Sequence, residues 1–213
     1  DAEKFEAEES AQSNTESDLQ HQVDANGPLL LNVSTYGVHK NLETLIETLP
    51  RLIDDYPNLK LVTTTSREQT SDKEEYDALT KRAHELGVGG AWTELGYVPH
   101  EELPSVYRTA DIFIFPSFTE SFGHPMVEAM ASGLPIVAAD TDVNREVCAS
   151  AGSYFDTFDP ADCAETIRSV LEDENKQAEM RQTSIRRAKH FSWKQHTERL
   201  AEIFWETAKE GQN

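Results

Sequence analysis

The segment 117–137 reads SFTESFGHPMVEAMASGLPIV, and its pattern predicts a loop, a short helix and a strand. It follows the run 111–116 (DIFIFP), which is short, rich in β-forming residues and closed by proline, as expected of a buried strand. Pro125 fits the first position of a helix, where its missing N–H costs nothing. Gly133 fits the left-handed position that ends a helix, and the apolar run 136–139 predicts the next strand.

This order of elements predicts a ligand site at the start of the helix. The N–H groups near Met126 and Val127 are expected to lack partners within the helix and to attract an anion. Gly123 has no Cβ, so a phosphate or a sugar can approach the backbone closely. Glu120 precedes the helix and Glu128 lies about one turn into it, and each carboxylate can accept the two hydroxyls of a vicinal diol. Together they suit a sugar–diphosphate–ribose ligand.

A longer motif runs from Glu120 to Glu128 as E-x7-E, with FGxP at 122–125 and EAxAxGxP at 128–135. This motif resembles that of the retaining glycosyltransferases of the GT-B fold, and most closely the large family 4 of nucleotide-sugar-dependent enzymes. A bare pair of glutamates is more often a pair of solvated surface residues. The strand, glycines and prolines in register with the pair favour the functional interpretation.

The resemblance implies a role for each residue of the motif. Glu128 is expected to bind the ribose hydroxyls of the donor, and Glu120, as the catalytic residue, to contact hydroxyls of the transferred sugar. The backbone that meets the sugar and the diphosphate is formed by Phe122, Gly123, His124 and Pro125. The implied donor is a UDP-sugar or a GDP-sugar, with no further cofactor and no obligatory metal.

Two other segments carry the resemblance further. The run 28–34 (PLLLNVS) predicts the first core strand, and Lys40 follows it at the carboxyl end of the sheet, where open α/β folds bind ligands. The resemblance implies that Lys40 contacts the donor diphosphate, usually with an arginine a few residues earlier, but Thr35 occupies that position. The segment 97–103 matches one whose backbone lies beside the nucleotide base, with Val98 as the contact; a plain strand–helix turn is the alternative.

Strands alternate with helices along the chain, which predicts an α/β fold: a Rossmann-like, doubly wound parallel sheet with helices on both faces, one half of a GT-B fold. Residues 1–27 are acidic and predict a largely irregular linker, and 28–213 a nucleotide-sugar-binding domain. The opening DAEKF resembles the family's segment just after the hinge between its two domains. The resemblance therefore implies a C-terminal half whose partner is an N-terminal acceptor domain of the same protein.

Local signals predict how several helices begin and end. Asn41 is expected to cap a helix, and Pro50 to kink that helix, to end it or to begin a new turn. Ser71 and Glu74 fit a capping box. The resemblance implies that the last helix packs against both domains of the intact enzyme. Without the partner domain, part of its apolar face would be exposed to solvent; this face comprises Trp193, Leu200, Ile203, Phe204 and Trp205.

The bulk composition excludes several classes of function. The formal charge is −20, which disfavours nucleic acid or an anionic membrane as a partner of this surface. No apolar run is long enough to span a membrane and no signal peptide is visible, so we expect a cytoplasmic protein whose membrane contact, if any, is not through this domain. Cys148 and Cys163 lack metal or redox spacing and are expected to be buried thiols.

Asp140 and Asp142 form an Asp-x-Asp pair, which in the other glycosyltransferase fold holds a metal with the donor diphosphate. The pair follows the last strong strand, so we interpret it as a polar loop and helix cap, and we expect no metal site.

The predicted function is therefore donor binding by one half of a retaining glycosyltransferase, with no transfer by this half alone. Two alternatives remain open at this point. One is a GT-B enzyme that is not a transferase, such as a nucleotide-sugar epimerase or a phosphorylase. The other is a non-enzymatic α/β interaction module, which would not respond to nucleotides or to loss of Glu128.

Overall fold

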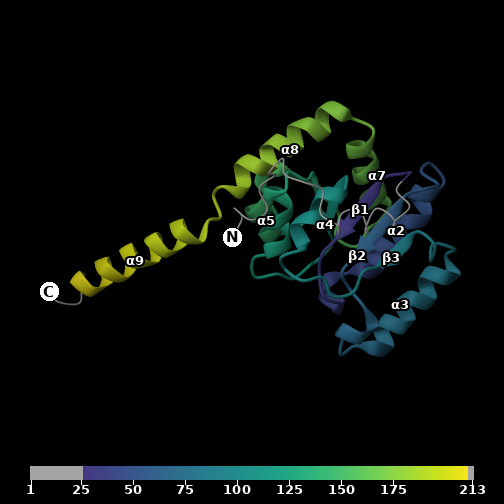
Figure 1. The fold of residues 1–213 in the computed structure, drawn as a ribbon, viewed down its shortest axis with the longest axis horizontal. Helices are drawn as coiled ribbons and strands as arrows, with labels where there is room; N and C mark the ends of the chain where they lie inside the picture. Colours follow the sequence, from purple (N-terminus) through teal and green to yellow (C-terminus); the bar gives the residue numbers. More distant parts are fainter. Residues whose placement is uncertain (1–25, 211–213) are drawn as a thin grey trace.

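A computed structural model describes residues 26–210, which form a six-stranded parallel sheet flanked by helices (Figure 1). The strand order is β3-β2-β1-β4-β5-β6, and every neighbouring pair is parallel. The strands are β1 (Leu29–Asn32), β2 (Lys60–Thr63), β3 (Trp92–Glu94), β4 (Ile112–Phe115), β5 (Ile136–Ala139) and β6 (Gly152–Phe155). The predicted parallel, doubly wound fold is confirmed, and each predicted strand is present.

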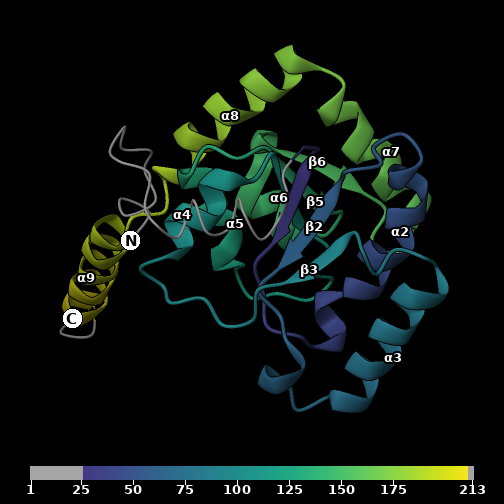
Figure 2. The same ribbon diagram turned by 45° about the vertical axis from the view of Figure 1, so that its right-hand side comes forward.

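Helices cover both faces of this sheet, as Figure 2 shows, with α4, α5 and α6 on one side and α2, α3 and α7 on the other. The helices are α2 (Leu42–Ile53), α3 (Lys73–Glu85), α4 (Leu103–Thr109), α5 (His124–Ala131), α6 (Asp142–Cys148), α7 (Pro160–Leu171), α8 (Glu174–Ala188) and α9 (Trp193–Glu210). Short 3-10 turns lie at Val38–Lys40, Arg67–Gln69 and Ala149–Ala151.

The central strands β1, β4 and β5 are buried along their whole length, and β4 and β5 are wholly apolar. In β4, Phe113 and Phe115 point into the cluster beneath α4, α5 and α6, and Ile112 and Ile114 point into the cluster beneath α2, α3 and α7. Successive side chains of a strand alternate between its faces, so a continuous apolar run fills two cores at once. This is why the run 111–116 could be recognised as a central strand.

The last helix, α9, extends away from the body of the domain (Figure 1). Its aromatic residues are exposed, with 58% of Trp193, 70% of Phe204 and 67% of Trp205 accessible. The expectation that this face lies open is confirmed. Within residues 26–210, no helix combines the length and the apolar composition that a membrane span requires.

Two local predictions at helix ends are wrong, at Asn41 and Ser71, and part of a third is wrong. The helix α2 neither ends nor restarts at Pro50 but continues to Ile53. Asn41 occupies the position before α2 with a left-handed backbone (φ 55°), and its side chain makes no capping bond. At α3 the capping position belongs to Asp72 rather than Ser71, again without a side-chain bond. At Asn41, hydrogen bonds to the Pro116 and Thr157 carbonyls outweigh the local signal.

The predictions about the two cysteines and about Gly133 are confirmed. Cys148 and Cys163 are buried free thiols, as expected, and burial raises the pKa of each to about 12. Gly133 ends α5 with a left-handed backbone (φ 73°) as predicted. The predicted acidic linker, 1–27, lies outside the described residues except for its last two positions.

Candidate functional site

The strand order reverses between β1 and β4. The chain builds β1, β2 and β3 in one direction and then β4, β5 and β6 in the other, and β1 pairs with β4 through Leu30–Ile112 and Leu31–Phe113. The loops that follow these two strands, 33–41 and 116–123, therefore diverge from adjacent strand ends. Open α/β sheets bind ligands outside the carboxyl ends of the strands at this kind of point. We call this side of the sheet the carboxyl edge.

Asn41 connects the loops of the carboxyl edge. Its Nδ2 donates to the carbonyl oxygen of Pro116 at 3.2 Å and to that of Thr157 at 2.8 Å. Its Oδ1 accepts from the Thr44 hydroxyl at 2.8 Å. One buried amide thus joins the loops after β1, β4 and β6. This role explains why Asn41 does not cap α2, and sequence spacing gives no sign of it.

A second set of bonds fixes the two central loops to each other. The carbonyl oxygen of His39 accepts from the Ser117 hydroxyl at 3.0 Å and from the backbone N–H of Phe118 at 3.1 Å. His39 itself is exposed. The loops that carry the predicted site residues are therefore held in a fixed relative position by backbone and side-chain bonds alone.

Lys40 and Glu120 meet across this junction. The two residues are 80 positions apart in the sequence, and Lys40 Nζ lies 2.5 Å from Glu120 Oε1. Only 19% of the lysine side chain and 13% of the glutamate side chain are exposed, so water screens this pair less than a surface ion pair. The structure thus brings together two residues that the sequence singled out for separate reasons.

Gly123 occupies the position before α5. Its backbone is left-handed (φ 82°), and an added Cβ would lie 2.5 Å from Met126 Cε and 3.4 Å from the ring of Phe115. A side chain at this position would therefore enter the core, which gives Gly123 a structural reason that the sequence did not show. The Met126 N–H is also not a free donor, since it donates to the Gly123 carbonyl at 3.0 Å. Pro125 takes the second helical position, because α5 begins at His124.

The ring of Phe122 packs between two other rings. It lies edge-on to His124, with centroids 5.0 Å apart, and edge-on to Phe191, with centroids 5.4 Å apart. Phe191 follows α8 and lies beneath Arg187, whose guanidinium carbon is 4.9 Å from the ring centroid. His124 is exposed. The segment 122–125 therefore packs against Phe191 through Phe122, while the side chain of His124 is exposed to solvent.

Glu128 is partly buried on α5, and its partner comes from α4. The Tyr107 hydroxyl donates to Glu128 Oε2 at 3.0 Å, and the Pro125 carbonyl oxygen lies 3.3 Å from the same hydroxyl. Burial raises the pKa of Glu128, while the bond from Tyr107 opposes that rise. The ring of Tyr107 is fully buried. The contact with Glu128 was not foreseen.

Val98 and Thr35 lie elsewhere on the same edge. Val98 belongs to the loop between β3 and α4, and its side chain packs into the core beneath α4 and α5. Its neighbour Tyr97 is 77% exposed. Thr35 is exposed in the loop after β1. Val98 shares the carboxyl edge with Lys40 and Glu120 but belongs to a separate loop.

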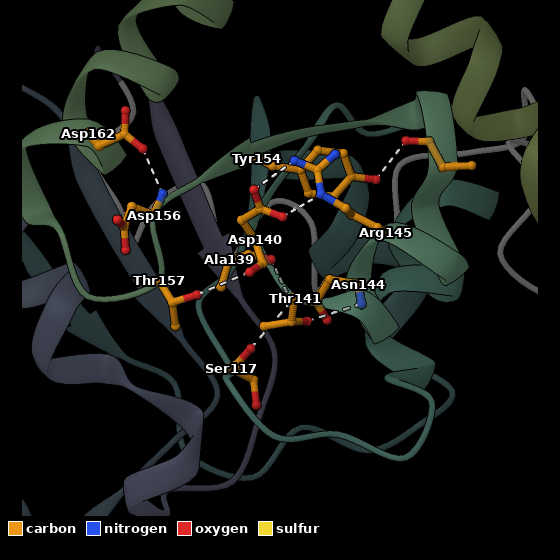
Figure 3. A network of polar contacts seen from close by, with 11 residues as sticks. Ser117, Ala139, Asp140, Thr141, Asn144, Arg145, Tyr154, Asp156, Thr157 and Asp162 are labelled. Carbon is orange, nitrogen blue, oxygen red and sulfur yellow. Dashed lines mark hydrogen bonds and ion pairs between the residues drawn. The ribbon is translucent and has the colours of Figure 1, made fainter.

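Asp140 is committed to a structural contact (Figure 3). Arg145 donates to both of its carboxylate oxygens and stacks over the Tyr154 ring, 4.5 Å from the centroid. Beside this pair, Thr141 caps α6 by accepting the N–H of Asn144, whose side-chain amide donates to the Ser117 and Ala139 carbonyls (Figure 3). The loop is polar as interpreted, but the cap is Thr141 and not an aspartate, because Asp142 is the first residue of α6.

The sequence of this chain matches the model of one protein family. The family model described as "Glycosyl transferases group 1" matches residues 13–187. The chain belongs to this family. The E-x7-E motif and its surrounding glycines and prolines lie inside the matched region, so the family assignment and the carboxyl-edge geometry refer to the same residues.

Curated relatives of this group 1 chain are named glycosyltransferases. A D-inositol 3-phosphate glycosyltransferase of Corynebacterium efficiens is 32% identical over 169 residues, which cover 78% of this chain and 40% of that protein. O-antigen chain mannosyltransferase B of Escherichia coli is 37% identical over 114 residues, 53% of this chain and 30% of that protein. The chain spans less than half the length of these relatives.

Solved structures share the fold of this group 1 chain. HepE of Anabaena, solved in complex with UDP-glucose, superposes with a TM-score of 0.84 at 21% identity, over 97% of this chain and 55% of that one. The C-terminal domain of a group 1 glycosyl transferase (LpcC) of Francisella tularensis gives a TM-score of 0.74 at 20% identity, over 89% of this chain and 96% of that one. These likenesses show the GT-B-type Rossmann-like fold.

The contacts of Asn41 predict a measurable cost for its loss. We expect Asn41→Gly, which tolerates the left-handed backbone, to lower the free energy of unfolding by about 2 kcal/mol, because it leaves two buried carbonyls without a donor. Urea denaturation measures this change, and Asn58→Gly, in an exposed turn, should change it by about 0.5 kcal/mol or less. Equal effects of the two substitutions would contradict the connecting role of Asn41.

Proposed function

We propose that this chain binds a nucleoside-diphosphate sugar, either a UDP-sugar or a GDP-sugar, at the carboxyl edge between β1 and β4. The proposal extends to its role, which is to serve as the donor half of a retaining glycosyltransferase. The observation that carries it is the meeting of Lys40 and Glu120 at 2.5 Å, beside the helix that bears Glu128. A cation for phosphate and two carboxylates for hydroxyls then lie within one group of adjacent loops.

Each residue has a chemical task in this proposal. Lys40 offsets the charge of the diphosphate, and such preorganised electrostatics is usually the largest contribution to catalysis. Glu128 accepts the ribose hydroxyls, and Glu120 orients the transferred sugar as the catalytic residue. The backbone of 122–125 lies against the sugar and the diphosphate, and the backbone at Val98 lies beside the base.

The comparisons support a nucleotide-sugar as the ligand class. The Anabaena neighbour was solved with UDP and with UDP-glucose, and the relatives carry the names of sugar transferases. Neither the neighbour nor the relatives fix the base or the sugar for this chain. Thr35, where the family usually has arginine, removes one cation from the expected phosphate contacts, so Lys40 carries more of that task.

We further propose that transfer needs an acceptor domain that this chain does not supply. The chain aligns with nearly the whole of the isolated Francisella domain and with about half of the Anabaena protein. Lys40 and the backbone N–H groups of the 122–125 segment would stabilise the leaving diphosphate, with no metal and no further cofactor required. Any contact with a membrane would then belong to the other domain.

The direct test is calorimetric titration of the chain with UDP and, separately, with GDP. We expect one of them to bind with a dissociation constant between about 1 µM and 1 mM, the usual range for enzyme substrates. Glu128→Ala should weaken that binding at least about tenfold, because it removes the acceptor for two hydroxyls.

The matched control is Glu165→Ala, which removes an exposed carboxylate from α7 and should leave binding unchanged. Binding that survives Glu128→Ala would place the nucleotide elsewhere. Silence with both nucleotides would favour the interaction module. Transfer of sugar to an acceptor by this chain alone would refute the division of labour between two domains.

The ion pair makes a second prediction, about UDP without its sugar. Glu120→Gln should tighten UDP binding by about twofold to tenfold, because Lys40 no longer has to leave a carboxylate partner to meet the diphosphate. Lys40→Met should weaken UDP binding. The advantage of UDP-glucose over UDP should shrink in Glu120→Gln, since Glu120 contacts the sugar. If Glu120→Gln weakened UDP as much as Lys40→Met does, the competition would be disproved.

A further inference from the structure

Tyr107 is a buried tyrosine whose hydroxyl points at two candidate donor-binding groups. It lies on α4, its ring is fully buried, and its hydroxyl is 3.0 Å from Glu128 Oε2 and 3.3 Å from the Pro125 carbonyl oxygen. Both of these acceptors belong to α5. One hydroxyl therefore connects the helix after the Val98 loop with the helix that bears Glu128.

The surroundings of Tyr107 hold this hydroxyl in place. Its ring packs against Phe113 of β4, with centroids 5.7 Å apart, in the core cluster beneath α4 and α5. Burial raises the pKa of Tyr107 well above its ordinary value, so the hydroxyl keeps its proton and acts as a donor. A bond from a neutral donor to a carboxylate is stronger than one between two neutral groups.

We propose that Tyr107 is a positioning residue for donor binding, which fixes the Glu128 carboxylate in the orientation that accepts the ribose hydroxyls. The inference rests on the proposed function, because it assigns Glu128 the same ligand. Glu128 Oε2 is held by Tyr107, and Oε1 together with the second lone pair of Oε2 is left for the ligand. Without the hydroxyl, the carboxylate loses this bond and is free to change rotamer.

The same contact widens the pH range over which Glu128 is ionised. Burial raises its pKa, and the groups that face it lower it: first the Tyr107 hydroxyl from α4, then His100 from the β3–α4 loop and His124 from α5. A carboxyl group accepts ribose hydroxyls through both oxygens only when it is ionised. Removing the Tyr107 hydroxyl raises the pKa of Glu128 further, so ligand binding should be lost at a higher pH as the solution is acidified.

The test is Tyr107→Phe, titrated with UDP and GDP from pH 4.5 to 8 beside the wild-type chain. The substitution removes only the hydroxyl. We expect it to weaken binding of the preferred nucleotide by about fivefold to twentyfold at neutral pH and to move the acid limb of the binding profile upward. Tyr56→Phe is the matched control, because it deletes another tyrosine–glutamate bond, to Glu172, away from the carboxyl edge, and should change neither quantity.

A double-mutant cycle separates positioning from a general loosening of the fold. If Tyr107 acts through Glu128, then Tyr107→Phe should have almost no further effect in the Glu128→Ala background. Glu128→Gln, measured on its own, should remove the acid limb that is attributed to Glu128. This variant keeps the experiment decisive even if Tyr107→Phe unfolds, which thermal denaturation would reveal.

The outcomes distinguish the inference from the function on which it rests. Wild-type binding that Glu128→Ala removes but Tyr107→Phe leaves intact would overturn the positioning role alone. Additive losses in the cycle, or an acid limb that persists in Glu128→Gln, would overturn it as well. Absence of nucleotide binding by the wild-type chain would overturn the proposed function and the inference together.

Discussion

The candidate site depends on the buried amide of Asn41. The loops after β1, β4 and β6 leave the sheet at the carboxyl edge, and the last two present backbone carbonyls that accept hydrogen bonds from Asn41. These are the carbonyls of Pro116 and Thr157, and Asn144 donates to a similar pair, those of Ser117 and Ala139. A buried carbonyl without a partner costs free energy, so these amides hold the loops in one arrangement. Lys40 precedes Asn41 directly, and its position follows from that arrangement.

The net charge of the chain opposes the binding of an anionic ligand, so a fixed arrangement of local donors and cations becomes important. The chain carries a formal charge of −20, so its overall field repels a diphosphate. In the proposed function, binding comes from the few favourable groups at the carboxyl edge, where Lys40 is paired with Glu120. The proposal has the same lysine shared between a carboxylate and a phosphate, which would link recognition of the diphosphate to the freedom of the Glu120 carboxylate.

The sequence predicted the fold because the fold depends on the alternation of apolar strands and amphipathic helices along the chain. The apolar run 111–116 contains a strand that is buried on both faces. Gly133 follows α5 in the left-handed conformation that glycine adopts most easily. Lys40, Glu120 and Glu128 could be singled out from a motif. The bond from Tyr107 to Glu128 could not, because it arises from how α4 packs against α5, and neither helix encodes the other's position.

The failed prediction at Asn41 has a clear physical origin. Helix-end preferences are worth about 1 kcal/mol for a cap. The Asn41 amide instead makes two tertiary hydrogen bonds, to the Pro116 and Thr157 carbonyls, and these contacts outweigh the local preference. At Pro50, α2 continues because its apolar face is buried. At Gly123 the structure adds a reason for glycine that the sequence did not show, since an added Cβ would meet Met126 and Phe115.

In the proposed function, a nucleotide occupies the carboxyl edge between β1 and β4. Backbone amide chemical shifts, followed by NMR while UDP or GDP is added, test this most directly, because they report on each loop separately. We expect the amide shifts to change in 34–41, 95–103 and 117–128 and to stay constant at the opposite edge of the sheet and along α3. Changes confined to α9 or to the amino ends of the strands would contradict it.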